Sequence, residues 1–133
     1  MVARWLVVCG ALLVSAVLAT GQRLLGGPME ASMDEEGVQR ALQFAMNEYN
    51  RGSNDMYASR VSEVIRLRKQ IVSGMKYFID VKVGRTTCRK SVADVGNCAF
   101  HEAPGMAKLQ ICNFVVYAVP WLNQVSLLEN NCH

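Results

Sequence analysis

Four cysteines in the second half of the sequence are the residues whose type and number most clearly predict chemistry. Cys88, Cys98, Cys112 and Cys132 could form disulfides, bind zinc or act as nucleophiles. None of them stands in a Cys-x-x-Cys pair, the spacing typical of structural zinc sites. An even number of cysteines in a small secreted chain favours disulfides instead. Four cysteines allow three pairings, and both Cys98–Cys112 and Cys112–Cys132 would enclose a plausible turn, so the residues alone leave the pairing open.

The other residues that could catalyse a reaction do not form a recognisable site. The sequence has two histidines, His101 in a polar stretch and His133 at the last position. The acidic residues 34–36 are better explained as the start of a helix, where negative charge is favourable. We find no Gly-x-Ser-x-Gly elbow, phosphate-binding loop, dinucleotide motif or metal-ligand spacing. We therefore expect neither an enzyme nor a protein that binds a cofactor or a metal ion.

The N-terminal segment has the composition of a secretory signal peptide. A short basic start precedes a mostly apolar run over residues 5–18, and small residues follow the run. The run is shorter than the roughly 20 apolar residues that a membrane-spanning helix needs, which disfavours a membrane anchor. We predict a signal peptide over residues 1–21, cleaved after Ala19 or Gly21, and hence a secreted, extracellular protein.

The rest of the chain, residues 22–133, is long enough for one small domain. Removal of the signal peptide would also remove Cys9, the fifth cysteine of the sequence. The whole sequence has 14 lysines and arginines against 11 aspartates and glutamates, a net charge of +3. So weak a positive charge gives no reason to expect binding to nucleic acid or to an anionic membrane.

One amphipathic helix follows a segment without periodicity. Residues 22–32 contain two glycines and a proline, which predicts a flexible N-terminal arm. The helix begins at the acidic residues 34–36 and ends in the cluster of turn-forming residues 50–55. Its apolar residues recur at spacings of three and four and form one stripe, made of Val38, Ala41, Leu42, Ala45, Met46 and Tyr49.

Alternating apolar and polar residues after the helix predict an antiparallel sheet. Two strand-like runs, residues 57–70 and 75–83, can pair as a hairpin. An apolar, β-branched run over residues 109–119 is stopped by Pro120, which cannot donate to a strand ladder, and a last short strand follows. An irregular polar loop, residues 89–107, separates the two pairs. The outline is an α+β fold in which one helix packs on an antiparallel sheet.

Three apolar features lie where polar turns or a polar arm would be expected. They are Leu24-Leu25 in the arm, Ile71-Val72 at the first hairpin tip and Pro120-Trp121 at the second. Each pair taken separately could belong to the core. Alternate hairpin tips of an antiparallel sheet emerge at the same edge, however, and the arm can reach that edge from the start of the helix. Together the three features predict an exposed apolar wedge, and such patches usually mark interaction sites.

The motifs around these features resemble those of the type 2 cystatins, secreted inhibitors of papain-like cysteine proteases. The resemblance covers essentially all of residues 22–133 and includes the order and spacing of the four cysteines. It rests on Arg23-Leu24-Leu25-Gly26-Gly27, on Gln70-Ile71-Val72-Ser73-Gly74, which matches Gln-x-Val-x-Gly, on Gly84-Arg85-Thr86-Thr87-Cys88, and on Pro120-Trp121. The resemblance implies a five-stranded antiparallel sheet wrapped around the helix, with disulfides Cys88–Cys98 and Cys112–Cys132.

The resemblance also implies a function and a mechanism. The chain is expected to inhibit papain-like proteases such as lysosomal cathepsins reversibly, competitively and tightly, as a monomer that blocks the active-site cleft. Leu24 and Leu25 would fill the subsites that hold substrate residues ahead of the scissile bond. Gly26 would let the chain turn away before a peptide bond reaches the catalytic thiol. The two hairpin tips, residues 70–74 and 120–121, would lie in and beside the cleft.

A second inhibitory site is implied by the turn after the helix. Some type 2 cystatins inhibit legumain, an asparagine-specific protease, through an asparagine in this loop. Ser53-Asn54-Asp55 fits that loop, so Asn54 would be the residue offered to the enzyme. The alternative is a solvated turn, because Asn and Asp are common in turns.

Two further hypotheses concern assembly and function. The β-branched Val72 in a tight tip could be strained, and opening of this hairpin would allow a domain-swapped dimer that buries the wedge. The main alternative to an inhibitor is a secreted binding or signalling module on the same scaffold, without a protease target.

Overall fold

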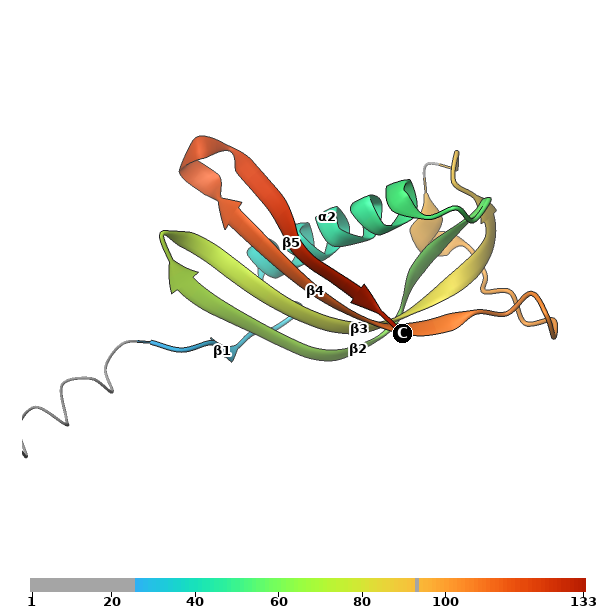
Figure 1. Cartoon of the computed structure of the whole chain (residues 1–133), viewed down its shortest axis with the longest axis horizontal. Helices are drawn as coiled ribbons and strands as arrows, with labels where there is room; N and C mark the ends of the chain where they lie inside the picture. The colour runs from blue at the N-terminus through green and yellow to red at the C-terminus, as the bar shows by residue number, and fades with distance from the viewer. Residues whose placement is uncertain (1–25, 93) are drawn as a thin grey trace, which may run out of the picture.

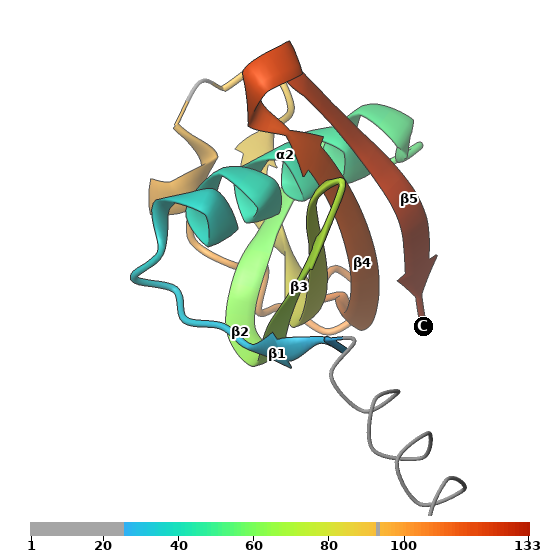
Figure 2. The same cartoon turned by 90° about the vertical axis from the view of Figure 1, so that its left-hand side faces the viewer.

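One helix lies across the concave face of a curved sheet of five antiparallel strands (Figures 1 and 2). The computed structural model describes residues 26–92 and 94–133. The helix is α2 (Glu36–Gly52), and the strands follow one another in the sheet in chain order, as β1 (Met29–Glu30), β2 (Tyr57–Val72), β3 (Gly74–Arg89), β4 (Leu109–Val119) and β5 (Gln124–Cys132). The predicted α+β fold with a five-stranded antiparallel sheet is confirmed. Within the described residues, no helix has the length and the apolar content needed to span a membrane.

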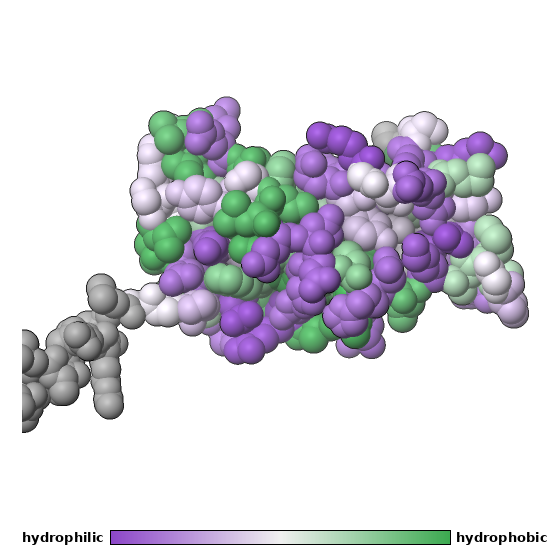
Figure 3. Space-filling view, viewed as in Figure 1, coloured by the Kyte–Doolittle hydropathy of each residue, from purple (hydrophilic) through white to green (hydrophobic). Residues whose placement is uncertain are grey.

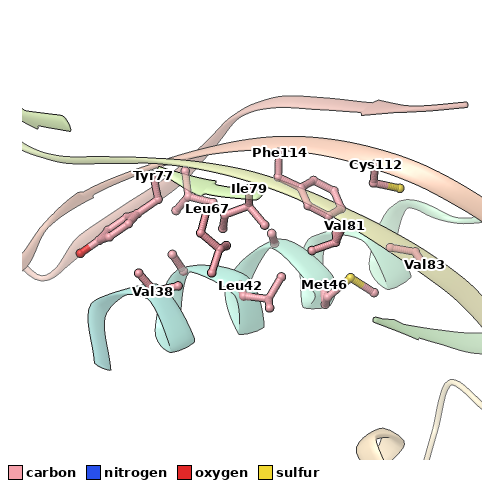
Figure 4. Close-up of a cluster of buried hydrophobic side chains, with 13 residues drawn as sticks. Val38, Leu42, Met46, Leu67, Tyr77, Ile79, Val81, Val83, Cys112 and Phe114 are labelled. Atoms are coloured by element: carbon pink, nitrogen blue, oxygen red, sulfur yellow. The ribbon is translucent and has the colours of Figure 1, made fainter. Parts of the chain in front are cut away.

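The core forms between the predicted stripe of α2 and the inner face of the sheet (Figure 4). Five residues of the stripe are buried, and Tyr49 is partly buried beside them. The sheet contributes Leu67, Ile79, Val81 and Phe114, which are nearly or fully buried. Burial of one large apolar side chain contributes about 1.5–3 kcal/mol, so this interface is the main source of stability. It fixes the helix, and therefore the segments at both of its ends, against the sheet.

The first hairpin is longer and tighter than the sequence predicted. Strand β2 pairs with β3 so closely to the tip that Val72 lies opposite Gly74 and Ser73 alone forms the turn. Strand β3 does not end near Val83 but continues to Arg89, because β2 still provides partners there and an isolated bridge joins Thr86 to Phe100. The 89–107 segment therefore starts from a strand end and includes the short 3-10 helix η3 (Val95–Asn97).

The predicted arm over residues 22–32 contains a strand that its composition did not indicate. Met29 and Glu30 form β1 and pair with Lys69 and Arg68 of β2. A two-residue strand is too short to show a periodic pattern, so only the resemblance implied a fifth strand. The predicted signal peptide and the arm residues Leu24 and Leu25 lie outside the described residues.

Both disulfides implied by the resemblance are present. Cys88–Cys98 joins the end of β3 to the loop beyond η3, and Cys112–Cys132 links opposite residues of β4 and β5. The bonded cysteines are 10 and 20 positions apart in the sequence. For loops of this length, the reduced entropy of the unfolded chain stabilises the fold by about 3 kcal/mol per disulfide. The second bond holds β5, the last strand of the sheet, to its neighbour.

Candidate functional site

The tip of the first hairpin exposes apolar side chains. Ile71 and Val72 are 67% and 42% exposed, although both belong to a strand. The hairpin tip extends beyond the N-terminal end of α2, so the helix does not cover these side chains (Figure 1). Ser73 is exposed at the turn itself, whereas Gly74 is buried. The structure therefore places the last four residues of the Gln-x-Val-x-Gly motif in two different environments, three exposed and Gly74 buried.

Gly74 is required by the contact between the two hairpins. Its φ is +114°, a conformation that L side chains rarely adopt. A Cβ at this position would lie 2.7 Å from the carbonyl oxygen of Ala118 on β4. Only glycine lets the first hairpin lie this close to the second.

The tip of the second hairpin is a single 3-10 turn, η4 (Pro120–Leu122). Pro120 starts the turn with a fixed φ, and Asn123 closes it in the left-handed conformation, with φ 53° and a hydrogen bond of 3.1 Å from its N–H to the Pro120 carbonyl. The turn points Trp121 and Leu122 outward, where they are 68% and 58% exposed. Leu122 was not predicted as a site residue, although its position beside Trp121 in the same tip could have indicated it.

The two tips lie side by side at one end of the molecule (Figures 1 and 2). Met75, which follows the first tip, pairs with Ala118, which precedes the second. The hydroxyl of Tyr117 also donates a hydrogen bond to the Ser73 carbonyl and so ties the first turn to β4. Tyr117 is a positioning residue that the sequence did not reveal, because its role depends on the register between β3 and β4.

The described start of the chain approaches the same end. The side-chain amide of Gln70 donates a 3.4 Å hydrogen bond to the carbonyl oxygen of Gly26. Further along, the Ala31 N–H donates to the Leu67 carbonyl at 3.0 Å. These contacts, with the β1–β2 pairing, lead the chain along β2 toward the first tip. Gly26 therefore lies beside the first hairpin.

An ion pair secures the turn between β1 and α2. Lys69 on β2 donates to one carboxylate oxygen of Glu35, and the Ser32 N–H donates to the other at 2.8 Å. The hydrogen bond from Lys69, followed by that from Ser32, holds the pKa of Glu35 below its usual value. The ionised form of Glu35 is therefore the form that fastens the arm to the sheet.

We call Ile71, Val72, Trp121 and Leu122 together the apolar edge. In Figure 3, apolar surface gathers over both hairpin tips, at the left of the molecule. Pro120 is also exposed there. The edge comes from hairpins that are hydrogen-bonded to each other, so a partner would meet a surface that is already formed.

Asn54 is exposed in a loop whose neighbouring residues are fixed. The Asp55 N–H donates to the Ser53 hydroxyl at 3.0 Å, and the Tyr57 N–H donates to an Asp55 carboxylate oxygen at 3.0 Å. The other Asp55 oxygen accepts a 2.6 Å hydrogen bond from Arg85 Nε on β3. The loop therefore holds the backbone on both sides of Asn54 while its side chain is open to solvent.

The electrostatics of this loop depend on Asp55. Burial by itself would raise the pKa of Asp55, but the hydrogen bonds from Tyr57 and Arg85 and the nearby positive charges outweigh it and lower the pKa. The ionised carboxylate is thus the form that orders the loop at neutral pH.

The candidate enzymatic residues do not come together. His101 packs edge-on against the ring of Tyr57, with 4.5 Å between the ring centroids, as expected of an ordinary loop residue. Within residues 26–92 and 94–133, no group of three histidine, cysteine or acidic side chains could hold a metal ion.

A helix on a five-stranded antiparallel sheet, with two hairpin tips forming an apolar edge, defines a binding protein of the cystatin fold. The Cystatin domain family matches residues 26–121, and the chain belongs to this family. Cystatins are protease inhibitors and not enzymes, so the class predicted from the sequence is confirmed.

Known proteins support this membership over most of the chain. Cystatin-2 of Crotalus adamanteus is 59% identical over 131 residues, which cover 97% of this chain and 96% of that protein. Cystatin of Gallus gallus is 56% identical over 123 residues, 91% of this chain and 88% of the relative. Among solved structures, that of dimeric human cystatin F superposes with a TM-score of 0.72 at 31% identity, covering 81% of this chain and 86% of that chain.

Proposed function

We propose that this protein is secreted and inhibits papain-like cysteine proteases, lysosomal cathepsins among them, by placing the apolar edge in the active-site cleft. Inhibition is reversible and competitive, because the edge blocks access and forms no covalent bond. The observation that carries the proposal is the exposure of four large apolar side chains on two hydrogen-bonded tips at one end of the molecule. Family membership supplies the class of target.

The size of the apolar edge is sufficient for tight binding. An aromatic side chain buries about 150–250 Å². At about 25 cal/mol per Å², Trp121 alone could contribute at most roughly 4–6 kcal/mol before ordering costs. Ile71 and Leu122 add further apolar area. Because hydrogen bonds already order both tips, the entropy lost on binding is small.

The arm completes the edge in this proposal. Gly26 lies beside Gln70, so Leu24 and Leu25 can reach the part of the cleft that holds substrate residues ahead of the scissile bond. Gly26 lets the chain turn away before a peptide bond meets the catalytic thiol. The Glu35–Lys69 ion pair and the β1–β2 pairing fasten the arm behind this point.

Steady-state inhibition of papain by the oxidised chain starting at Gln22 tests the proposal. Trp121→Ala is expected to weaken inhibition at least about 30-fold, since buried aromatic residues at the centre of an interface contribute about 2 kcal/mol or more. Removal of residues 23–25 is expected to weaken it as well. Leu109→Ala is the matched control, because Leu109 is 62% exposed but starts β4 at the other end of that strand.

Each outcome has a definite meaning. Strong competitive inhibition that both changes weaken and Leu109→Ala leaves intact supports the proposal. No inhibition by a folded, monomeric protein contradicts it. That result would favour the alternative, a secreted binding or signalling module that uses the same scaffold without a protease target.

We propose legumain as a second target, bound through Asn54. The observation in favour is the exposure of Asn54 between the anchored residues Ser53 and Asp55. Asn54→Ala is expected to abolish inhibition of legumain and to leave inhibition of papain unchanged. Legumain inhibition that survives Asn54→Ala would contradict this assignment and leave the loop as a solvated turn.

The active form in this proposal is the monomer, because a domain-swapped dimer would bury the apolar edge. Among the described residues, the positive φ values belong to Asn123 and to glycines, Gly74 included, so backbone strain at Val72 has no support in φ. Size-exclusion chromatography after mild heating tests the swap. A dimer that no longer inhibits papain would support it, and an active monomer as the sole product would contradict it.

A further inference from the structure

A cavity of about 370 Å³ lies between the N-terminal half of α2 and the β4–η4–β5 hairpin. Its volume is near the lower end of the range of about 300–1,000 Å³ for small-molecule sites. The helix contributes Gly37, Arg40, Ala41 and Phe44, and the sheet contributes Tyr77 and Val125 among others. Most of the lining residues are apolar, and the polar ones are Arg40, Tyr77, Asn123 and Gln124.

The phenol has no hydrogen-bond partner within the described part of the chain. Tyr77 is only 8% exposed, and its hydroxyl makes none of the hydrogen bonds found among residues 26–92 and 94–133. Figure 4 shows the ring reaching past Val38 toward the N-terminal end of α2. A Cβ at Gly37 would overlap the phenol oxygen, so the absence of a side chain there makes room for the hydroxyl in the cavity wall. The hydroxyl oxygen itself keeps some exposure, so it opens on the cavity and is free to donate to a bound acceptor.

The cation in the wall is weakly engaged. Arg40 forms an ion pair with Glu36 at 3.5 Å, but both side chains are largely exposed and such pairs contribute little. The positive end of the α2 dipole lies in the same wall, at Gly37. The cavity therefore combines apolar surface with the Tyr77 hydroxyl, the polar residues Asn123 and Gln124 and one positive charge, which suits an anionic acceptor.

We propose that this cavity binds a small amphipathic monocarboxylate, with its apolar part between α2 and the second hairpin and its carboxylate on Tyr77 and Arg40. The Tyr77 hydroxyl donates a hydrogen bond to one carboxylate oxygen, and the Arg40 guanidinium turns from Glu36 to pair with the ligand. The walls at Ala41, Phe44 and Val125 hold the apolar part. This site adjoins the apolar edge at Pro120 but contains none of its four residues, and it does not depend on protease inhibition.

A titration followed by two-dimensional NMR of the ¹⁵N-labelled, oxidised chain starting at Gln22 tests the proposal. Octanoate is the probe, and octanol and octylammonium are the neutral and cationic probes of the same length. Octanoate is expected to give saturable shifts of the amide signals of Gly37, Ala41 and Val125. Octanol is expected to bind at least about tenfold more weakly, since a charge-assisted hydrogen bond is lost. Trp121 emission gives a second readout, because Pro120 beside it also lines the cavity.

Single substitutions separate the two polar contacts. Tyr77→Phe removes the hydroxyl and keeps the packing, and is expected to weaken octanoate binding about tenfold. Arg40→Gln is expected to weaken it about threefold, as befits an exposed charge. Arg51→Gln is the matched control, because Arg51 is a similarly exposed arginine of α2, paired with Glu48 away from the cavity.

Three results would overturn the proposal. They are no saturable shift with millimolar octanoate, octanol binding as tightly as octanoate, or an Arg40→Gln variant that binds octanoate like Arg51→Gln. The Arg40 comparison stands even where Tyr77→Phe fails to fold, because Arg40 is exposed and takes no part in the core.

Discussion

Gly74 is the residue at which the stability of the fold and the geometry of the apolar edge depend on each other. The resemblance to the cystatins placed Gly74 in a hairpin tip that would lie in a protease cleft. The structure adds a reason internal to the protein, since its missing Cβ gives space to the Ala118 carbonyl of β4. The side-by-side position of the two tips thus depends on a residue that is itself buried.

We expect Gly74→Ala to lower the free energy of unfolding by at least about 2 kcal/mol. The change adds backbone strain at a positive φ, which costs about 1–3 kcal/mol, to the overlap with Ala118. Urea unfolding measures the loss. Gly52→Ala is the control, because a Cβ there meets nothing within 4 Å, and it is expected to be neutral or slightly stabilising. Equal stability of the two variants would show that the contact is not tight.

Asp55 is the residue that makes the Asn54 loop sensitive to pH. Its pKa is lowered in the folded protein, so its extra stabilisation is present above the ordinary carboxylate pKa and is lost as pH falls through the lowered value. Asp55→Asn is expected to cost about 1–2 kcal/mol at pH 7, because it replaces charge-assisted hydrogen bonds from Arg85 and Tyr57.

The cost of Asp55→Asn should shrink as pH falls through the lowered pKa of Asp55, where the wild-type carboxylate is protonated as well. Unfolding by urea at a series of pH values measures the difference between variant and wild type. Asp34→Asn is the control, because Asp34 is exposed in the turn before α2. A cost for Asp55→Asn that does not change with pH would contradict the assignment of the loop to the ionised carboxylate.

Strand β1 is the element that joins the arm to the sheet, and it is the weakest element of the fold. It pairs two residues with β2, and its further support is the Glu35–Lys69 pair and an exposed pair between Glu30 and Arg66. Such a strand can open without unfolding the core, since few apolar contacts hold it. The position of the arm is therefore set locally.

We expect Glu35→Gln to speed hydrogen exchange of the Ala31 amide, which donates to Leu67 beside β1, and to leave global stability unchanged. The reason is the loss of the charge-assisted bond from Lys69 to Glu35. Because the pKa of Glu35 is lowered, the difference from wild type at a given pH should disappear as pH falls through that pKa. Glu36→Gln serves as the control, since Glu36 pairs within the helix. Equal exchange in both variants would contradict the anchor.

The elements that the sequence predicted are those with a repeating pattern. The stripe of α2 and the alternation in residues 57–70 and 75–83 predicted the helix and the first hairpin, because one buried face imposes a period on the side chains. The apolar, β-branched run that ends at Pro120 predicted β4 and the second tip. Strand β1 has two residues and shows no period. The extension of β3 to Arg89 also escaped prediction, since pairing with β2 and the bridge at Phe100 decide it.

The candidate site also contains features that the sequence could predict and features that it could not. The exposed apolar residues were predictable because they stand where turns are polar in most proteins. Contacts between the hairpins, such as Tyr117 to Ser73, were not, because they depend on how two strand pairs lie beside each other. Leu122 is an intermediate case. Its place beside Trp121 is visible in the sequence, but the outward direction of its side chain follows from the 3-10 turn η4.

At the scale of the whole molecule, the two candidate inhibitory sites lie at opposite ends of the helix. The apolar edge is at one end of the sheet, and the Asn54 loop follows the C-terminal end of α2 (Figure 1). The helix has 17 residues and therefore spans about 25 Å. A rigid core fills the space between the sites, so two proteases could approach without meeting.

We expect one molecule to bind papain and legumain at the same time, with each affinity within about twofold of its value alone. We expect no coupling free energy, because the two sites share no residue and the length of α2 separates them. Legumain affinity measured with and without saturating inactivated papain gives the coupling. Trp121→Ala should remove the papain part of the complex alone, and Asn54→Ala the legumain part alone. A tenfold loss of legumain affinity on papain binding would mean that the proteases collide or that the helix transmits a change between the two ends.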